Sequence, residues 1–302
     1  MGASERIVLG SRGSDLALAQ TKLVEQALRC AWPDLEIATE IIRTSGDESA
    51  PGAPVTDRKA GRKGMFTREI EKQLLVRQID LAVHSAKDLP SEAMDELEIC
   101  GALPRAAAGD VLITRNDFTL TSLPAGAVVA TGSVRRQRQL HWKRPDLEVA
   151  DLRGNVPTRL RKLRETESWS GIVLARAGLE RLGLAVKGEN LSPEDFVPAG
   201  GQGIIALQLR RDETRARRLI DAINHDATLI CLRAEREFLR LLDGDCDSPV
   251  GVQASMVEEK LWLHAQVFEA EISAPRAGML SGPPGQPEAI AARLMEKVYG
   301  SS

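Results

Sequence analysis

The sequence predicts an α/β protein with two α/β domains and a small α+β domain at its C-terminal end. Three observations support this prediction. Apolar runs typical of strands alternate with amphipathic helical segments from residue 6 to about residue 209. A Gly-rich segment at 198–203 precedes the last of these strands and is a hinge candidate. The 302 residues suffice for two or three domains, because single cores stop growing at about 250 to 300 residues.

The first domain follows from a simple order of elements. We predict a strand at 6–9, a turn at 10–14, a helix at 16–29 and a second strand at 35–42. A loop at 44–62, a helix at 66–76 and a strand at 81–83 follow. The helix places Leu16, Leu23, Ala27 and Cys30 near one face, which we expect to be buried. The loop at 44–62 is rich in Gly, Pro, Ser and Asp and has no hydrophobic period, so we expect a mobile loop or lid.

A second set of alternating elements begins near residue 104. Strands are predicted at 111–114, 127–130, 147–151 and 172–175, with helices near 134–141, 158–164 and 179–182. The apolar strand at 204–209 then returns the chain to the first sheet, which implies a cleft and a two-stranded hinge between the domains. We therefore expect a first domain at 1–103 and 204–222 and a second at 104–203, hinge included.

The remaining residues, 223–302, form the predicted α+β domain. Two helices end near residue 242, and a loop at 243–251 leads into a hairpin with strands at 252–257 and 261–269. The hairpin turns at Glu258 and Glu259. The segment at 271–287 is irregular by its pattern, and a last helix is predicted at 287–299.

Composition indicates an ordinary globular protein, with 43% apolar and 27% charged residues and a formal net charge of -3. Neither a signal peptide nor a membrane-spanning run is evident, so we expect a cytoplasmic protein without a membrane partner. The four cysteines are far apart in the sequence and none has a nearby histidine, which argues against disulfides and against a metal site. A monomer is expected.

Positive charge is concentrated between Thr131 and Arg164, a segment that contains ten Lys and Arg residues and only three acidic residues. A protein of slightly negative charge has no general reason for such a cluster, so a local anionic ligand is one explanation. A solvated helix face is the other.

Polar residues follow the predicted strands where each strand ends. In open α/β sheets the ligand crevice lies outside the carboxyl ends of the strands, where helix N-termini also attract anions. Arginine pairs with carboxylates in a bidentate fork. The pattern therefore favours an anion site over a solvated face, and it comprises Arg12, Ser14, Lys87, Asp88, Thr131, Ser133, Arg153 and Asn155.

Asp88 is a carboxylate in this cationic setting, which suits it to stabilising a cationic intermediate. Capping of the turn before Leu89 and Pro90 is the alternative role. His84 is expected to be a hydrogen-bonded structural group. Cys246 lies in an acidic polar loop that should raise its thiol pKa, so a permanent covalent attachment fits it better than repeated nucleophilic attack. An incidental surface cysteine is the other interpretation.

Seven separated motifs resemble the porphobilinogen deaminases, also called hydroxymethylbilane synthases. They occur in the order of that family and are SRGS at 11–14, GRKGMF at 61–66, HSAKDLP at 84–90, TGSVRRQ at 131–137, LRGNVPTR at 152–159, AGLERLG at 177–183 and GQG at 201–203. The resemblance implies two domains like those of periplasmic binding proteins and a third, small domain. It also implies a transferase that condenses four porphobilinogen molecules head to tail, with loss of ammonia.

The resemblance assigns a role to each matching residue. The family builds its product on a dipyrromethane cofactor held by a thioether, here at Cys246, in a loop where Asp245 replaces a glycine usual in the family. Asp88 matches the catalytic aspartate, which faces the cationic azafulvene. The residues expected to bind the carboxylates of substrate and cofactor are Arg12, Arg135, Arg136, Arg153, Arg159 and Arg181, supported by Ser14, Lys63, Lys87, Thr131, Ser133 and Gln202.

Two functions of other classes compete with this interpretation. A nucleic-acid-binding protein would need aromatic stacking partners, but aromatic residues make up 3% of the chain and Trp142 is the only one between Thr131 and Arg164. A non-catalytic anion-binding protein of the same two-lobed form would need neither Asp88 nor Cys246. We therefore expect porphobilinogen as the partner and no nucleic acid.

Overall fold

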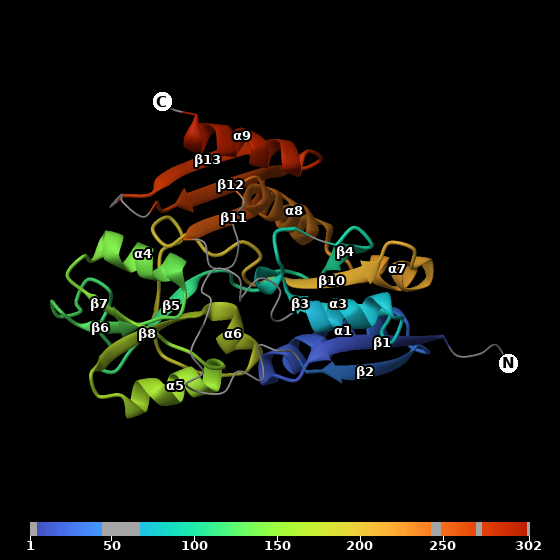
Figure 1. The fold of residues 1–302 in the computed structure, drawn as a ribbon, viewed down its shortest axis with the longest axis horizontal. Coiled ribbons are helices and arrows are strands. Elements are labelled where there is room, and N and C mark those ends of the chain that lie inside the picture. Colours follow the sequence, from blue (N-terminus) through green and yellow to red (C-terminus); the bar gives the residue numbers. More distant parts are fainter. Residues whose placement is uncertain (1–4, 44–66, 93, 243–248, 270–273, 301–302) are drawn as a thin grey trace. The chain divides into compact units, whose positions relative to one another are not determined.

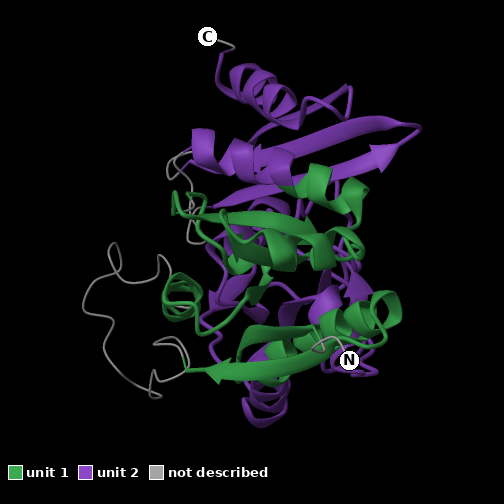
Figure 2. Ribbon diagram, turned by 90° about the vertical axis from the view of Figure 1, so that its right-hand side faces the viewer, with its two compact units in different colours: residues 1–105, 204–232 green, residues 106–203, 233–302 purple. Residues whose placement is uncertain are grey.

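The computed structural model describes residues 5–43, 67–92, 94–242, 249–269 and 274–300 (Figure 1). These residues form two compact units, Met1–Arg105 with Ile204–Leu232 and Ala106–Gly203 with Arg233–Ser302 (Figure 2). The predicted loop at 44–62 lies outside the described residues.

The first unit contains a five-stranded sheet in the order β2-β1-β3-β10-β4. β1 is parallel to both β2 and β3, whereas β10 is antiparallel to both β3 and β4. Its elements are β1 (Arg6–Arg12), α1 (Asp15–Ala31), β2 (Glu36–Ile42), α3 (Arg68–Leu75), β3 (Leu81–Ser85), the 3-10 helix η1 (Ala86–Asp88), β4 (Leu97–Ala102), β10 (Ile205–Arg210), α7 (Thr214–Asp221) and the start of α8 (Asp226–Leu241).

Helices cover both faces of this sheet because its strands are apolar on both sides. Val24 and Leu28 of α1 and Leu219 of α7 pack with Ile7 and Leu9 in one core cluster. Ile70 and Leu74 of α3 belong to a second cluster on the other face. The predicted α/β class is confirmed for this unit.

The predicted apolar face of α1 is not its most buried face, although Ala27 packs against the core. Leu23 is 41% exposed and Cys30 is exposed, while Gln20, Thr21, Val24 and Leu28 are buried. Gln20 and Thr21 can be buried because each bonds a serine hydroxyl, Gln20 Nε2 to Ser85 at 2.8 Å and Thr21 Oγ1 to Ser11 at 2.7 Å. Hydropathy spacing cannot detect a helix face stabilised by such polar pairs.

The second unit contains a five-stranded sheet in the order β7-β6-β8-β5-β9. β6 is parallel to β7 and β8, and β5 is antiparallel to β8. The elements are β5 (Asp110–Thr114), β6 (Val128–Ala130), α4 (Val134–Lys143), β7 (Glu148–Ala150), α5 (Val156–Glu165), β8 (Trp169–Ala175), α6 (Arg176–Arg181) and β9 (Glu189–Asn190).

The two sheets share one connectivity. In the first sheet, β10 lies between β3 and the edge strand β4 and is antiparallel to β3. In the second sheet, β5 lies between β8 and the edge strand β9 and is antiparallel to β8. Both β10 and β5 are the first strands after the chain passes from one unit to the other. The predicted return of the strand at 204–209 to the first sheet is confirmed. Fold class is thus confirmed as two α/β units, each with a mixed sheet.

The second unit also holds a small antiparallel sheet, β11-β12-β13, made of β11 (Val250–Val257), β12 (Lys260–Val267) and β13 (Arg276–Gly282), with α9 (Pro287–Tyr299). The predicted hairpin is confirmed, and its turn residues Glu258 and Glu259 have φ of 48° and 61°. The segment at 271–287, predicted as irregular, contains β13. Its sequence is rich in Gly, Ala and Ser, so pairing with β12 rather than local preference makes it a strand.

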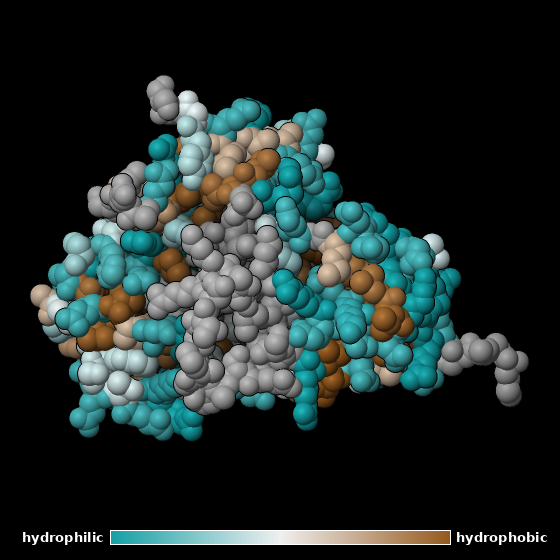
Figure 3. Space-filling view, viewed as in Figure 1, coloured by the Kyte–Doolittle hydropathy of each residue, from teal (hydrophilic) through white to brown (hydrophobic). Residues whose placement is uncertain are grey.

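The surface is mostly hydrophilic in the view of Figure 3, with hydrophobic residues broken up by polar ones. Exposed large apolar residues among the described ones, such as Ile41, Val76 and Met279, come from different elements. Single exposed apolar side chains are normal on a protein surface. Within the described ranges, none of the helices has the length and apolar character needed to cross a bilayer.

Candidate active site

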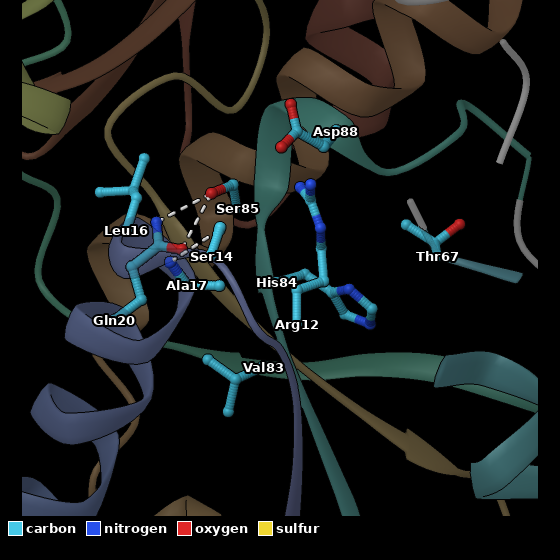
Figure 4. A pocket seen from close by; sticks show the side chains of 10 residues that line it. All are labelled: Arg12, Ser14, Leu16, Ala17, Gln20, Thr67, Val83, His84, Ser85 and Asp88. Carbon is cyan, nitrogen blue, oxygen red and sulfur yellow. Dashed lines mark hydrogen bonds between the residues drawn. The ribbon is translucent and has the colours of Figure 1, made fainter. Parts of the chain in front are cut away.

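A pocket in the first unit opens at the carboxyl ends of β1 and β3 (Figure 4). This is the sheet edge at which the sequence predicted an anion site. Its lining residues are Arg12, Ser14, Leu16, Ala17, Gln20, Thr67, Val83, His84, Ser85 and Asp88. Three predicted site residues, Arg12, Ser14 and Asp88, are therefore brought together.

The turn between β1 and α1 places Arg12 and Ser14. Ser14 is the N-cap of α1, and its hydroxyl accepts from the Ala17 N–H at 3.4 Å. Arg12 ends β1, and Figure 4 shows its side chain extending toward the side of the pocket where Asp88 lies. A cation beside a helix N-terminus makes this wall of the pocket suitable for an anion.

Asp88 ends the 3-10 helix that follows β3, directly before Leu89 and Pro90. The start of this turn is fixed to the sheet, since the Ala86 N–H donates to the Ile204 carbonyl at 3.0 Å. The neighbouring Lys87 is half-buried and is not among the residues that line the pocket. Lys63 and Cys246 lie outside the described residues, so their predicted roles stay predictions.

The second unit places Thr131 and Ser133 at the turn between β6 and α4. Ser133 is the N-cap of α4, with its hydroxyl 3.5 Å from the Arg136 N–H, and its own N–H donates to Thr131 Oγ1 at 3.3 Å. Thr131 is buried, whereas Ser133 is partly exposed.

Arg135 and Arg136 are buried in the first turns of α4 and share one carboxylate. Arg135 Nη1 lies 2.8 Å from Asp110 Oδ2, and Arg136 Nη2 lies 2.7 Å from Asp110 Oδ1. Burial raises the pKa of the Asp110 carboxyl, but the two guanidinium groups outweigh burial and hold that pKa below its usual range. The pKa of Arg135 is lowered by burial, against the attraction of Asp110.

Gln202 joins this buried cluster. Its Nε2 donates to Asp110 Oδ1 at 2.8 Å and to the Ala108 carbonyl at 2.6 Å, while its Oε1 accepts from Arg136 at 3.4 Å. Gln202 therefore supports Arg136 through Asp110, which is a role that the sequence motifs did not reveal.

The other predicted arginines of this unit are more accessible. Arg153 is exposed and pairs with Asp151 at 2.7 Å, and Arg159 donates from Nε to the Gly154 carbonyl at 2.7 Å. Arg181 donates to the Gly203 carbonyl at 2.7 Å, and burial lowers its pKa to about 10, so it remains a cation at neutral pH.

Sequence reasoning missed Asp110, which organises two of the predicted arginines. The available signal was weak, because Asp110 is a single acidic residue preceding the apolar run Val111–Thr114. A charged residue at the start of a strand that is buried on both faces requires a cationic partner. The sequence does not show which cation this is.

Together, the two mixed sheets and the polar pocket at the carboxyl ends of β1 and β3 define the class of protein, an α/β protein with a cationic side chain, Arg12, in its candidate site. Comparison with known proteins gives the family. The family model described as "Porphobilinogen deaminase, dipyromethane cofactor binding domain" matches residues 7–218, and "Porphobilinogen deaminase, C-terminal domain" matches residues 229–300. The chain belongs to the porphobilinogen deaminase family and is an enzyme of the transferase class.

Curated relatives agree with the family model over nearly the whole chain. The chain is similar to a porphobilinogen deaminase of Syntrophobacter fumaroxidans, with 39% identity over 98% of this chain and 99% of the relative. It is also similar to that of Moorella thermoacetica, with 42% identity over 97% of this chain and 92% of the relative. Among solved structures, it is similar to the probable amino-acid ABC transporter extracellular-binding protein ytmK from Bacillus subtilis, with 10% identity, a TM-score of 0.40 and coverage of 72% of this chain and 89% of that one.

Proposed function

We propose that this chain condenses four porphobilinogen molecules head to tail, with release of ammonia, and forms hydroxymethylbilane on a covalently bound dipyrromethane primer. The observation that supports this most directly is the pocket of the first unit, where Arg12 and Asp88 line one space. Porphobilinogen carries carboxylates and develops positive charge when ammonia leaves, so it requires one group of each sign.

The side chains present fit such ligands. The pocket offers the Arg12 guanidinium to a carboxylate and the Asp88 carboxylate to an N–H group, and the hydroxyls of Ser14 and Ser85 belong to the same lining. Thr67 Oγ1, in the pocket wall, is buried and lacks a hydrogen-bond partner among the described residues, which leaves it able to bond a ligand. When bound, the dipyrromethane supplies the pyrrole carbon to which the first substrate unit is joined.

Asp88 is the proposed catalytic residue. Loss of ammonia leaves a cationic azafulvene, and a fixed carboxylate stabilises that charge more strongly in a pocket than in water. Arg12 and Ser14 bind and orient the acidic side chains of the substrate. The Ala86 N–H fixes the start of η1 to the Ile204 carbonyl, so the backbone that carries the Asp88 carboxylate is in place before the reaction begins.

The arginines of the second unit are proposed to bind the carboxylates that accumulate as the product grows. Arg135 and Arg136 share the single negative charge of Asp110, so the trio has a net charge of +1. A buried positive charge favours an anionic ligand. Arg153, Arg159 and Arg181 are proposed to act in the same way, with Lys63, Lys87, Thr131, Ser133 and Gln202 as supporting donors.

We further propose a monomer that acts in the cytoplasm, with neither nucleic acid nor membrane as a partner. The net charge of -3 and the aromatic content of 3% support the exclusion of nucleic acid. The proposed division into domains at 1–103 with 204–222, 104–203 and 223–302 follows the same family pattern.

Intact-mass measurement of the purified protein tests this function. We expect an excess that matches two linked pyrroles on the wild type and on Cys30→Ser, which removes an exposed thiol elsewhere. Cys246→Ser should have the unmodified polypeptide mass and no turnover of porphobilinogen. Active wild-type protein of unmodified mass would show that Cys246 holds no cofactor, and a modified protein without turnover of porphobilinogen would overturn the proposed reaction.

A further inference from the structure

His84 lines the same pocket as Arg12 and Asp88, yet the proposed reaction gives it no task. Its side chain belongs to β3 and is almost fully buried, with 4% exposure. Its Nε2 lies 2.9 Å from Oε1 of Gln208 on β10. In the sheet, His84 pairs with Ala206, which is two residues before Gln208 on the same strand. His84 therefore lines the pocket while its ring is hydrogen-bonded to β10.

Gln208 is in turn bonded to a buried carboxylate. Its Nε2 donates to Glu71 Oε1 at 3.0 Å, and Glu71 on α3 is 3% exposed. His84, Gln208 and Glu71 thus form a buried chain of hydrogen bonds that connects the pocket with α3.

The direction of each bond in this chain follows from donor and acceptor chemistry. The amide nitrogen of Gln208 only donates hydrogen bonds, and it donates to Oε1 of Glu71. The carbonyl oxygen of Gln208 then faces His84, and a carbonyl oxygen also only accepts. His84 Nε2 must therefore carry the proton, which leaves Nδ1 as the acceptor nitrogen of the neutral ring.

We propose that Glu71 and Gln208 are positioning residues that hold His84 as the neutral, Nε2-protonated tautomer during turnover. Among the described residues, Arg12 and Asp88 are charged groups of the pocket that His84 lines, and Glu71 lies behind Gln208. With a neutral imidazole, His84 adds neither a positive charge nor a second N–H donor to the pocket that contains Asp88. The negative charge of Asp88 then remains available for the cation that forms as ammonia leaves. This inference rests on the proposed function for its purpose, but not for its geometry.

Position 208 has the residue type that this arrangement needs. A glutamate at 208 would place its carboxylate against both His84 Nε2 and the Glu71 carboxylate, and the combined negative charge of the two acids favours a doubly protonated, cationic ring. The amide of Gln208 donates to Glu71 through its nitrogen and accepts from His84 through its oxygen, and it brings no full negative charge to the ring. Gln208→Glu is therefore a substitution that changes the charge of His84 with little change in size.

Nuclear magnetic resonance of the full-length protein labelled with ¹⁵N tests the tautomer directly. The chain has four histidines, and long-range ¹H–¹⁵N spectra distinguish the two neutral tautomers and the cation. We expect His84 to be protonated on Nε2 alone at neutral pH in the wild type. Glu71→Gln should give a mixture of tautomers, because a glutamine at 71 can donate as well as accept. Glu69→Gln, two residues earlier on the same helix, should leave the His84 signals unchanged.

A wild-type His84 protonated on Nδ1, or a Glu71→Gln protein with unaltered His84 signals, would overturn the proposal. Neither result depends on enzyme activity, so a failure here is distinct from a failure of the proposed reaction. Turnover supplies a second readout, in which Gln208→Glu should lower kcat at pH 7 by about tenfold and leave KM nearly unchanged. That loss should recover as rising pH removes the proton from His84, whereas a loss that does not change with pH would contradict the role given to Gln208.

Discussion

Asp110 and Arg136 form a fully enclosed ion pair in the second unit, with Oδ1 and Nη2 2.7 Å apart and side chains that are 0% and 6% exposed. Arg135 shares the same carboxylate at 2.8 Å. Two cations therefore depend on one anion for their position and for most of their charge compensation. This makes Asp110 the residue on which the geometry of both predicted binding arginines depends.

Asp110→Asn should destabilise the protein by about 3 to 5 kcal/mol, because removing one partner leaves buried guanidinium groups uncompensated. Urea unfolding at neutral pH measures the change in the free energy of unfolding. Asp151→Asn is the matched control, since its partner Arg153 is solvent-exposed and such pairs contribute little. Equal losses in the two variants would show that the buried trio is not a main source of stability.

The same carboxylate gives a pH prediction. Its folded-state pKa lies below the unfolded value of about 3.9, so its stabilising contribution is present above that pH and declines as pH falls toward the folded-state pKa. The free energy of unfolding of the wild type should therefore fall more steeply than that of Asp110→Asn below about pH 4. Parallel curves for the two proteins in urea titrations at several acidic pH values would contradict the lowered pKa.

Asp88→Asn should reduce kcat by at least about 100-fold while leaving the cofactor attached, because the amide cannot offset a cationic intermediate. Single-turnover kinetics and intact mass on the same preparation measure the two effects. Asp95→Asn, at an exposed residue beyond the pocket, serves as control and should turn over normally. Wild-type rates in Asp88→Asn would rule out the catalytic role.

Glu235 should be important for the glycine-rich segment at 198–203. This fully buried carboxylate of α8 accepts from the Gly201 and Ala254 N–H groups at 2.6 Å each. In Glu235→Gln the amide NH₂ would face one of these two backbone N–H groups, which are also donors, and we expect the free energy of unfolding to fall by about 1 to 3 kcal/mol. Hydrogen exchange at Gly201 and urea unfolding should both report the loss. The control is Glu288→Gln, whose carboxylate makes an exposed pair with Arg233.

Gly203→Ala should be destabilising for two reasons. The residue has φ of +83°, and an added Cβ would lie 2.5 Å from the Ala106 carbonyl oxygen. The left-handed backbone alone costs about 1 to 2 kcal/mol for a residue with a side chain. Thermal unfolding should show a lower Tm than for Gly285→Ala, where nothing lies within 4 Å of the added atom. A Tm equal to that of the control would mean that the backbone can relax at Gly203.

The fold was largely predictable because its strands are apolar runs and its helices begin at recognisable caps. Ser14, Ser133 and Asn155 are N-caps at the starts of α1, α4 and α5, where side-chain chemistry acts over three residues. The strand β13 was not predictable, since its residues have little strand preference and become a strand only through pairing with β12.

Part of the candidate site was predictable for the same reason. Arg12 ends β1, Ser14 follows it and Asp88 ends the short turn after β3, and parallel strands bring such positions to one edge of the sheet. Their proximity in the first unit was therefore implied by local pattern and connectivity. The partners of Arg135 and Arg136 were not, because Asp110 is 25 residues or more away along the chain and belongs to another strand.

The sequence by itself determined the alternation of strands and helices, the identity of the family and the positions of the charged residues along the chain. Those properties depend on local spacing and on motifs that can be read without coordinates. Only the tertiary structure decided which charges are buried together, that Asp110 joins Arg135 and Arg136, and that Glu71 and Gln208 orient His84. The reason is physical, since the charge and donor direction of a buried group depend on neighbours that the chain brings close only when it folds.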